Sequence, residues 1–126
     1  MENQPDPQRL VCLLSELSDP GSKAFVLGSG DWPLRGFVVR QQGQVHAYLN
    51  RCPHARHPLN GQPDSFLSPD RSLIQCSSHG AMFEIATGAC MGGPCNGTAL
   101  RSLPIQVQGD HVVLLEDPNY LAEVVW

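Results

Sequence analysis

The sequence lacks the features that mark several common classes of protein. No run approaches the roughly 20 apolar residues that a membrane-spanning helix needs. The start, MENQPDPQR, has no apolar stretch of the kind found in secretory signals. Lys and Arg form no cluster, and the net charge is −4. We therefore expect a cytoplasmic protein that binds neither membranes nor nucleic acid.

What the sequence does contain is an excess of turn-forming residues and a set of cysteines. The 126 residues include 12 Gly and 11 Pro. Together these two residue types exceed their usual combined share of about 12%. Hydrophobic residues still make up 41% of the chain, which is enough for one modest core. We expect a single domain over residues 1–126. Five cysteines without an export signal indicate metal or redox chemistry before a framework of disulfides.

Alternation of apolar and polar residues predicts β-strands, and no stretch shows a 3.6-residue period over ten residues. One hairpin is expected from residues 36–41 and 45–49, joined by Gln42-Gly43. A second is expected from 105–108 and 111–115, joined by Gly109-Asp110. Further short strands are predicted at 10–14, 24–27, 72–76 and 81–86. The fold class is all-β, a small antiparallel β-sandwich or barrel.

Two stretches without a strand pattern interrupt this series, residues 51–70 and 87–99. Long irregular loops in a compact domain are usually functional or disordered, and these two contain or adjoin most of the cysteines and histidines. The first eight residues and the last few are expected to be tails. Trp32 is expected to anchor the core or a loop.

Two Cys-His pairs carry the chemistry. Cys52-Pro53-His54 is followed, after 21 intervening residues, by Cys76-Ser77-Ser78-His79. Two thiolates and two imidazoles suit either tetrahedral zinc or an iron–sulfur cluster. Paired zinc ligands usually have about two to four residues between them, so one residue between Cys52 and His54 is tight for a single ion. The crowding disappears if the thiolates bind one iron and the imidazoles another.

Other uses of the cysteines remain open. Cys76, His79, Cys90 and Cys95 form a second set suited to zinc. Cys90 and Cys95 are alternatively a disulfide or two thiols packed beside a cluster. We favour packed thiols because a reducing cytosol disfavours disulfides. Cys12 lies in an apolar strand and is expected to be a small buried hydrophobe.

The paired motifs resemble those of Rieske-type 2Fe–2S proteins, above all the small ferredoxin-type members. The resemblance covers roughly residues 10–116. It rests on the following motifs: Cys52-Pro53-His54, Leu59, Cys76-x-x-His79-Gly80, Phe83, Thr87-Gly88 and Gly93-Pro94. It implies a Rieske fold, with a loop-built cluster-binding subdomain at about 50–99 inserted in a basal β domain. The stretch before Cys76 is longer than in compact members, which suggests an enlarged surface loop at about 60–71.

By this resemblance, Cys52 and Cys76 bind the inner iron, and His54 and His79 bind the outer iron near the surface. His57 has no ligand role in the family pattern and is expected to be a loop residue. Leu59 and Met82 are expected either to cover the cluster or to belong to the core. His46 and His111 are expected to be structural or exposed.

The resemblance also bears on the reduction potential. Replacing two thiolates by neutral histidines makes the cluster less negative and therefore easier to reduce, which gives the family a range of about −150 to +300 mV. High-potential members have a disulfide across the cluster and hydroxyl donors to its sulfurs. The matching positions here hold no cysteine and no such hydroxyl: Arg56, Ser78, Ala81 and Phe83. Fewer hydrogen bonds stabilise the reduced state less, which predicts a low potential.

The expected function is that of a one-electron carrier and not of an enzyme. A Rieske oxygenase needs a second domain with a mononuclear iron site, and the chain is too short for one. The resemblance implies a flavin-containing reductase as donor and a terminal oxygenase as acceptor, with weak docking and a monomeric carrier. The alternatives are a permanently bound electron-transfer subunit and a zinc-binding regulatory module.

Charge is spread unevenly along the chain. Residues 50–101 hold four basic and three acidic groups, a balance of +1, and the remainder has a balance of −5. This pattern indicates either a solubilising surface or a molecular dipole that turns the loops toward a partner.

Overall fold

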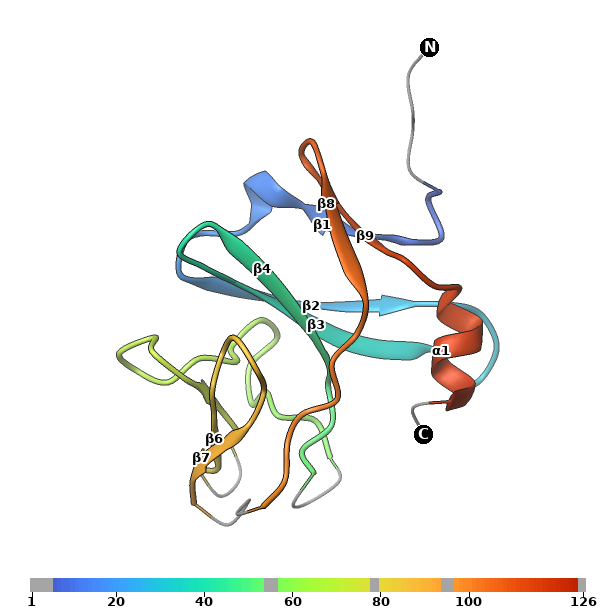
Figure 1. The fold of residues 1–126 in the computed structure, drawn as a ribbon. Coiled ribbons are helices and arrows are strands. Elements are labelled where there is room, and N and C mark those ends of the chain that lie inside the picture. Colours follow the sequence, from blue (N-terminus) through green and yellow to red (C-terminus); the bar gives the residue numbers. More distant parts are fainter. Residues whose placement is uncertain (1–5, 54–56, 78–79, 94–96, 125–126) are drawn as a thin grey trace.

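The structure, a computed structural model, describes residues 6–53, 57–77, 80–93 and 97–124. These residues form three antiparallel sheets of three strands each (Figure 1). The first sheet consists of β2 (Gly21–Leu27), β3 (Leu34–Gln41) and β4 (Gln44–Leu49). The second has the order β1 (Leu10–Leu13), β9 (His111–Leu114) and β8 (Ile105–Gln108). The third consists of β5 (Ile74–Gln75), β6 (Met82–Phe83) and β7 (Cys90–Gly92). The expected all-β fold is confirmed.

Both hairpins form at the residues that predict them. Gln42 and Gly43 have φ angles of 53° and 76°, the pair of positive values that a tight turn between twisted strands requires. The Asp19 carboxylate accepts hydrogen bonds from both of their N–H groups at 2.8 Å, which stabilises the turn. In the second hairpin, Gly109 supplies the positive φ of 63° between β8 and β9.

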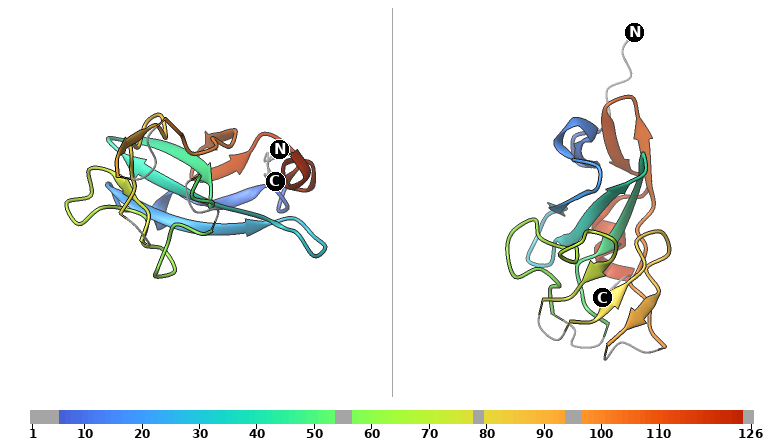
Figure 2. Two further views of the ribbon diagram at one scale, coloured as in Figure 1. Left: turned by 90° about the horizontal axis from the view of Figure 1, so that it is seen from below. Right: turned by 90° about the vertical axis from the view of Figure 1, so that its left-hand side faces the viewer.

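The β3–β4 hairpin is buried on both faces and separates two cores, so the expectation of one core is wrong. On one face, Val38, Ala47 and Leu49 pack in the basal core with β1, β9 and the C-terminal helix. On the other face, Phe37, Val39 and Tyr48 pack in a second core built mainly from the loop region. The predicted alternation along β4 is therefore right, but the second face meets protein and not water. Figure 2 (right) shows the β8–β9 hairpin and β7 at opposite ends, with β3 and β4 between them.

The C-terminal segment differs from the expected tail. Residues Pro118–Val124 form a helix, α1, which buries Leu121 and Ala122 in the basal core. The Asp117 carboxylate accepts the Asn119 N–H at 2.8 Å, the interaction of an N-terminal helix cap. A short 3-10 turn, η1 (Leu14–Glu16), follows β1. Among the described residues, no helix has the length and apolar character needed to cross a membrane.

Other expectations need correction in detail. The strands predicted at 72–76 and 81–86 shrink to the two-residue strands β5 and β6. Residues 87–99 were expected to be irregular, yet β7 forms there and pairs with β6. Trp32 is not a core anchor, because 80% of its surface is exposed.

Candidate metal centre

The two cysteines predicted as ligands each begin a loop of the same design. Cys52 follows β4 by three residues, and its N–H donates to the His57 carbonyl at 2.8 Å. Cys76 directly follows β5, and its N–H donates to the Ala81 carbonyl at 2.8 Å. Each hydrogen bond closes a loop from a cysteine to the fifth residue after it. Both cysteines are thiols outside any disulfide and are almost wholly buried.

A chain of hydrogen bonds joins the two loops through Asn50. The Leu59 carbonyl accepts the Ser77 N–H at 2.8 Å, and the Leu59 N–H donates to Asn50 Oδ1 at 2.9 Å. Asn50 Nδ2 donates to Asn60 Oδ1 at 3.0 Å, and the Asn50 N–H donates to the Arg35 carbonyl of β3. Asn50 thus ties both loops to the central sheet. Asn50 was not among the predicted site residues, because its only signal in the sequence is its place two residues before Cys52.

The second core surrounds the cysteines with apolar side chains. Leu59, Ala81 and Phe83 are fully buried there, whereas Met82 is half-buried. Tyr48 contributes its ring to this core and donates its hydroxyl proton to the Ile85 carbonyl at 2.6 Å. Burial, with a smaller contribution from Glu84, raises the pKa of Tyr48 to about 12. The hydroxyl therefore stays protonated and remains a donor.

A third loop approaches the Cys76 loop closely at Gly93. A Cβ added at Gly93 would lie 3.1 Å from the Ala81 Cα and 3.2 Å from the Gly80 carbonyl oxygen. Gly93 also has a φ of +81°, which favours glycine. Close approach and backbone conformation together require a residue without a side chain here.

Cys90, in β7 just before this approach, is disulfide-bonded. The interpretation of Cys90 as a packed free thiol is therefore wrong, because the argument from a reducing compartment says nothing about how the local chain brings sulfurs together. A disulfide sulfur is not a thiolate, so Cys90 is also lost from the second set suited to zinc. Cys95, the other member of the CMGGPC motif, lies outside the described residues.

The segment at 60–71 is a largely exposed loop that two of its residues attach to the first sheet. The Phe66 ring stacks on Phe37 of β3, with ring centroids 4.2 Å apart. Asp64 Oδ1 accepts the Ala24 N–H at 2.9 Å, and the Asp64 carbonyl accepts the Ser22 hydroxyl proton at 2.7 Å. Asp64 therefore satisfies part of the open edge of β2, where unpaired backbone groups would be exposed.

The described part of the chain contains two of the four predicted ligands, Cys52 and Cys76. His54 and His79 lie outside it, as do Arg56 and Ser78. Within the described residues, no three His, Cys, Asp or Glu side chains converge as a metal site. Two buried thiols, at the start of two matched loops joined by hydrogen bonds, fit one half of the ligand set of a 2Fe–2S cluster.

The other singled-out cysteine and histidines lie as the sequence indicates. Cys12 is buried in the basal core. Burial, reinforced by Glu16, raises the pKa of its thiol to about 11. His57 is a half-buried loop residue whose ring nitrogen Nδ1 lies 2.8 Å from the Pro58 carbonyl oxygen. His46 and His111 are half-buried in strands, and burial lowers the pKa of His46.

Comparison with known proteins decides the family. A family model for the Rieske [2Fe-2S] domain matches residues 8–112. The chain belongs to the Rieske [2Fe-2S] domain family. The ferredoxin component of the alkene monooxygenase system of Xanthobacter autotrophicus is 31% identical over 108 residues, which cover 86% of this chain and 80% of that protein.

Solved Rieske structures share the fold. The ferredoxin of carbazole 1,9a-dioxygenase from Nocardioides aromaticivorans superimposes with a TM-score of 0.66 at 26% identity, covering 83% of this chain and 93% of that chain. A chain from a complex of reduced oxygenase and oxidized ferredoxin of carbazole 1,9a-dioxygenase gives 0.65 at 25% identity, covering 86% and 93%. A Rieske domain binds a 2Fe–2S cluster, and these relatives are ferredoxins. This Rieske protein is an electron-transfer protein that carries such a cluster.

Proposed function

We propose that Cys52, His54, Cys76 and His79 hold the 2Fe–2S cluster, with the thiolates on the inner iron and the imidazoles on the outer one. The observation that carries this proposal is the matched pair of loops that start at the two buried cysteine thiols. When bound, the cluster accepts and releases one electron at a time. The chain's own residues keep water from the thiolates, since Leu59, Ala81 and Phe83 bury that side.

The carrier passes electrons from a flavin-containing reductase to a terminal oxygenase. The oxygenase partner is supported by the carbazole dioxygenase relative, whose solved complex contains an oxygenase and a ferredoxin. We further propose a cytoplasmic monomer, with residues 1–126 as one Rieske domain and residues 50–99 as its cluster-binding subdomain. Backbone hydrogen bonds close both cysteine loops and make them rigid, so that little rearrangement accompanies a change in the charge of the cluster.

A low reduction potential completes the proposal. Phe83 is fully buried and has no hydroxyl, and Ala81 has none either, so neither side chain stabilises the reduced state by donating to a cluster sulfur. A redox titration is expected to give a midpoint below about 0 mV, toward the lower end of the family range. A midpoint above about +100 mV contradicts this part of the proposal.

Spectroscopy tests the ligand set. The purified protein should be coloured, bleach on addition of dithionite, and give the electron paramagnetic resonance signal of a reduced Rieske cluster. His54→Cys and His79→Cys should each shift that signal toward that of a cluster with more thiolate ligands, or abolish it. Unchanged spectra in both variants would refute the assignment of the histidines. A colourless protein that contains zinc would refute the electron carrier, and a stable complex with a reductase or oxygenase component in size-exclusion chromatography would contradict a free monomer.

A further inference from the structure

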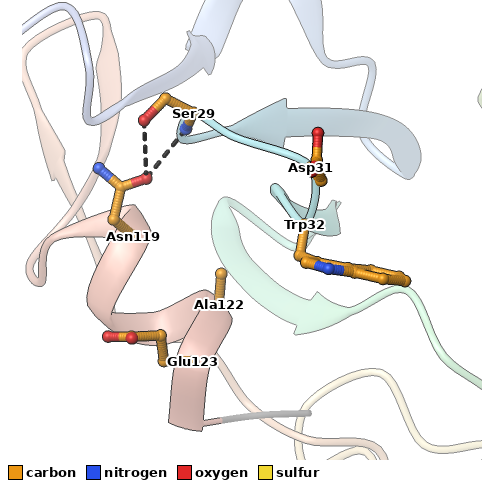
Figure 3. Close-up of a pocket in the computed structure, with 6 residues that line it drawn as sticks. All are labelled: Ser29, Asp31, Trp32, Asn119, Ala122 and Glu123. Atoms are coloured by element: carbon orange, nitrogen blue, oxygen red, sulfur yellow. Dashed lines mark hydrogen bonds between the residues drawn. The ribbon is translucent and has the colours of Figure 1, made fainter.

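A cavity of about 620 Å³ lies between the β2–β3 turn and helix α1 (Figure 3). Its described lining is small and comes from two segments: Ser29, Asp31, Trp32, Asn119, Ala122 and Glu123. None of these residues belongs to residues 50–99, so the cavity is separate from the ligand loops. We call it the Trp32 cavity.

The cavity has a fixed frame. Asn119 Oδ1, at the start of α1, accepts the Ser29 N–H at 2.9 Å and lies 3.4 Å from the Ser29 hydroxyl oxygen. Gly28 has a φ of +102°, and a Cβ there would lie 3.1 Å from Asn119 Oδ1. The turn and the helix are therefore joined by hydrogen bonds at one end of the cavity, as Figure 3 shows.

Trp32 is the most exposed of the large apolar side chains in the described part of the chain, with 80% of its surface open to solvent. Burying an indole against another surface is strongly favourable. Tryptophan and arginine are the residues most enriched among the energetic centres of protein interfaces. An exposed indole beside a cavity is therefore a candidate anchor for another protein.

The charged residues that line the cavity indicate which kind of ligand it binds. Asp31 and Glu123 are both exposed, and no basic residue is among the described residues that line the cavity. In Figure 3, Asp31 and Trp32 come from the same turn. The Glu123 carboxylate points from α1 away from the indole. Two carboxylates without a basic side chain among these residues favour a cationic ligand.

We propose that the Trp32 cavity docks an arginine side chain of a partner protein. The apolar stem of arginine can cover Ala122, and its planar guanidinium can stack on an indole and pair with a carboxylate such as that of Asp31. This inference rests on the proposed function, because a carrier needs recognition by its redox partners. It assigns part of that recognition to a surface that leaves residues 50–99 uncovered.

A titration followed by nuclear magnetic resonance tests this proposal on the cluster-loaded protein. Labelling tryptophan with nitrogen-15 gives two indole signals, from Trp32 and Trp126, and Trp32→Phe identifies the first. The probe is the blocked peptide acetyl-Gly-Arg-Gly-amide, and the matched peptide carries neutral citrulline in place of arginine. We expect a saturable shift of the Trp32 signal with the arginine peptide, at a Kd in the millimolar range for one exposed side chain. The citrulline peptide should give none.

Charge variants locate the site. Asp31→Asn should raise the Kd by about threefold or more, and Glu123→Gln should raise it less because its carboxylate points away from the indole. Glu16→Gln is the matched control, since Glu16 lies in η1 and the amide can still accept the Leu13 N–H. An equal shift with citrulline, or an unchanged Kd in Asp31→Asn, would overturn the proposal.

Two further arms exclude other occupants. Equal binding of tetramethylammonium would indicate a small organic cation and overturn the docking of a protein arginine. A shift of the Trp32 signal after removal of residues 125–126 would show that the chain's own end covers the cavity, which also overturns it. The visible spectrum of each sample reports the cluster independently. Failure of arginine binding in a coloured, reducible protein thus leaves the carrier function standing.

Discussion

Asn50 links the central sheet to both cysteine loops through side-chain and backbone hydrogen bonds. Its carboxamide accepts from Leu59 and donates to Asn60, and Leu59 in turn accepts from Ser77. Removing a partly buried side chain of this kind leaves a backbone donor without its acceptor, which costs about 1–3 kcal/mol. Because the same bonds fix the spacing of the loops, the loss should reach the cluster as well as the fold.

We therefore expect Asn50→Ala to lower the free energy of unfolding by about 1–3 kcal/mol and to speed the loss of iron to a chelator. Asn50→Asp keeps an oxygen that accepts the Leu59 N–H, so it should recover part of the loss. Gln108→Ala is the control, since it removes an exposed side-chain hydrogen bond to Gln106. Urea unfolding and loss of visible absorption measure both effects. Equal behaviour of Asn50→Ala and Gln108→Ala would contradict the role of Asn50.

The raised pKa of the Cys12 thiol predicts a dependence of stability on pH that is unrelated to the cluster. Its thiol pKa is raised from 9.0 to about 11 by burial first, then by Glu16 and Asp110, with Lys23 opposing them. Between these values the unfolded chain releases a proton that the folded chain retains. Rising pH therefore favours unfolding, and the stabilisation present below pH 9 is lost as pH rises through 11.

The comparison with Cys12→Ala isolates this effect. The difference in unfolding free energy between wild type and Cys12→Ala should favour wild type most at pH 8 and shrink by pH 10.5. Both proteins share every other titrating group, including Cys52 and Cys76. A difference that is constant or grows with pH would show that the thiol ionises as readily in the folded protein as in the unfolded chain.

At the scale of elements, the contact between the Gly93 turn and the Cys76 loop has a matched control in the chain. Gly93 and Gly97 both have a φ of +81°, but a Cβ at Gly93 would meet Ala81 and Gly80, whereas a Cβ at Gly97 would meet no atom of the described residues within 4 Å. Both alanine variants should lose about 1 kcal/mol from backbone conformation. Gly93→Ala should lose about 1–3 kcal/mol more from the close contact.

Thermal or urea unfolding measures this difference, and chelator-induced loss of iron shows whether it reaches the Cys76 loop. Gly93→Ala should release iron faster than Gly97→Ala. Equal stabilities and equal release rates would mean that the loop moves aside without cost, and that the approach at Gly93 does not shield the site.

The elements that could be predicted from sequence are those specified by local chemistry. Gln42-Gly43 and Gly109-Asp110 each define a tight turn, so the β3–β4 and β8–β9 hairpins followed directly. Strand β7 has three residues, and its pairing depends on how β6 and the loops fold around it, which no local pattern contains. Helix α1 is shorter than the window in which a helical period can be recognised. Its one local signal, the cap and first-turn pair Asp117-Pro118, was overlooked.

The candidate site also has parts that could be predicted from the sequence and parts that could not. The motifs around Cys52 and Cys76 predicted iron ligands, because the ligand types and their spacing lie in adjacent residues, and the structure adds that both thiols are buried. Asn50 acts through partners that lie far away in space or sequence, such as Arg35 and Ser77. Trp32 was expected to be a core or loop anchor, but it lies in the turn between β2 and β3 with 80% of its surface exposed. Neither the partners of Asn50 nor the position of α1 can be derived from spacing in the sequence.

At the scale of the whole molecule, charge is distributed so that the loop region differs from the body. Residues 50–101 have a balance of +1 and the remainder −5. A small ion that reacts at the cluster senses the potential nearby, because salt at about 0.1 M screens charges beyond roughly 10 Å. The net charge of −4 and the local charge therefore predict different responses to ionic strength.

Oxidation of the reduced protein by ferricyanide, a trivalent anion, distinguishes these two responses. If the electron leaves through the nearly neutral loop region, the rate constant in stopped-flow mixing should change little between about 0.02 and 0.5 M salt. If the whole charge of −4 governed the encounter, repulsion would be screened and the rate would rise steeply with salt. The trivalent cation tris(phenanthroline)cobalt(III) is the control of opposite sign. A steep rise with ferricyanide together with a steep fall with the cobalt complex would contradict electron exit through residues 50–101, because only an acidic surface produces both.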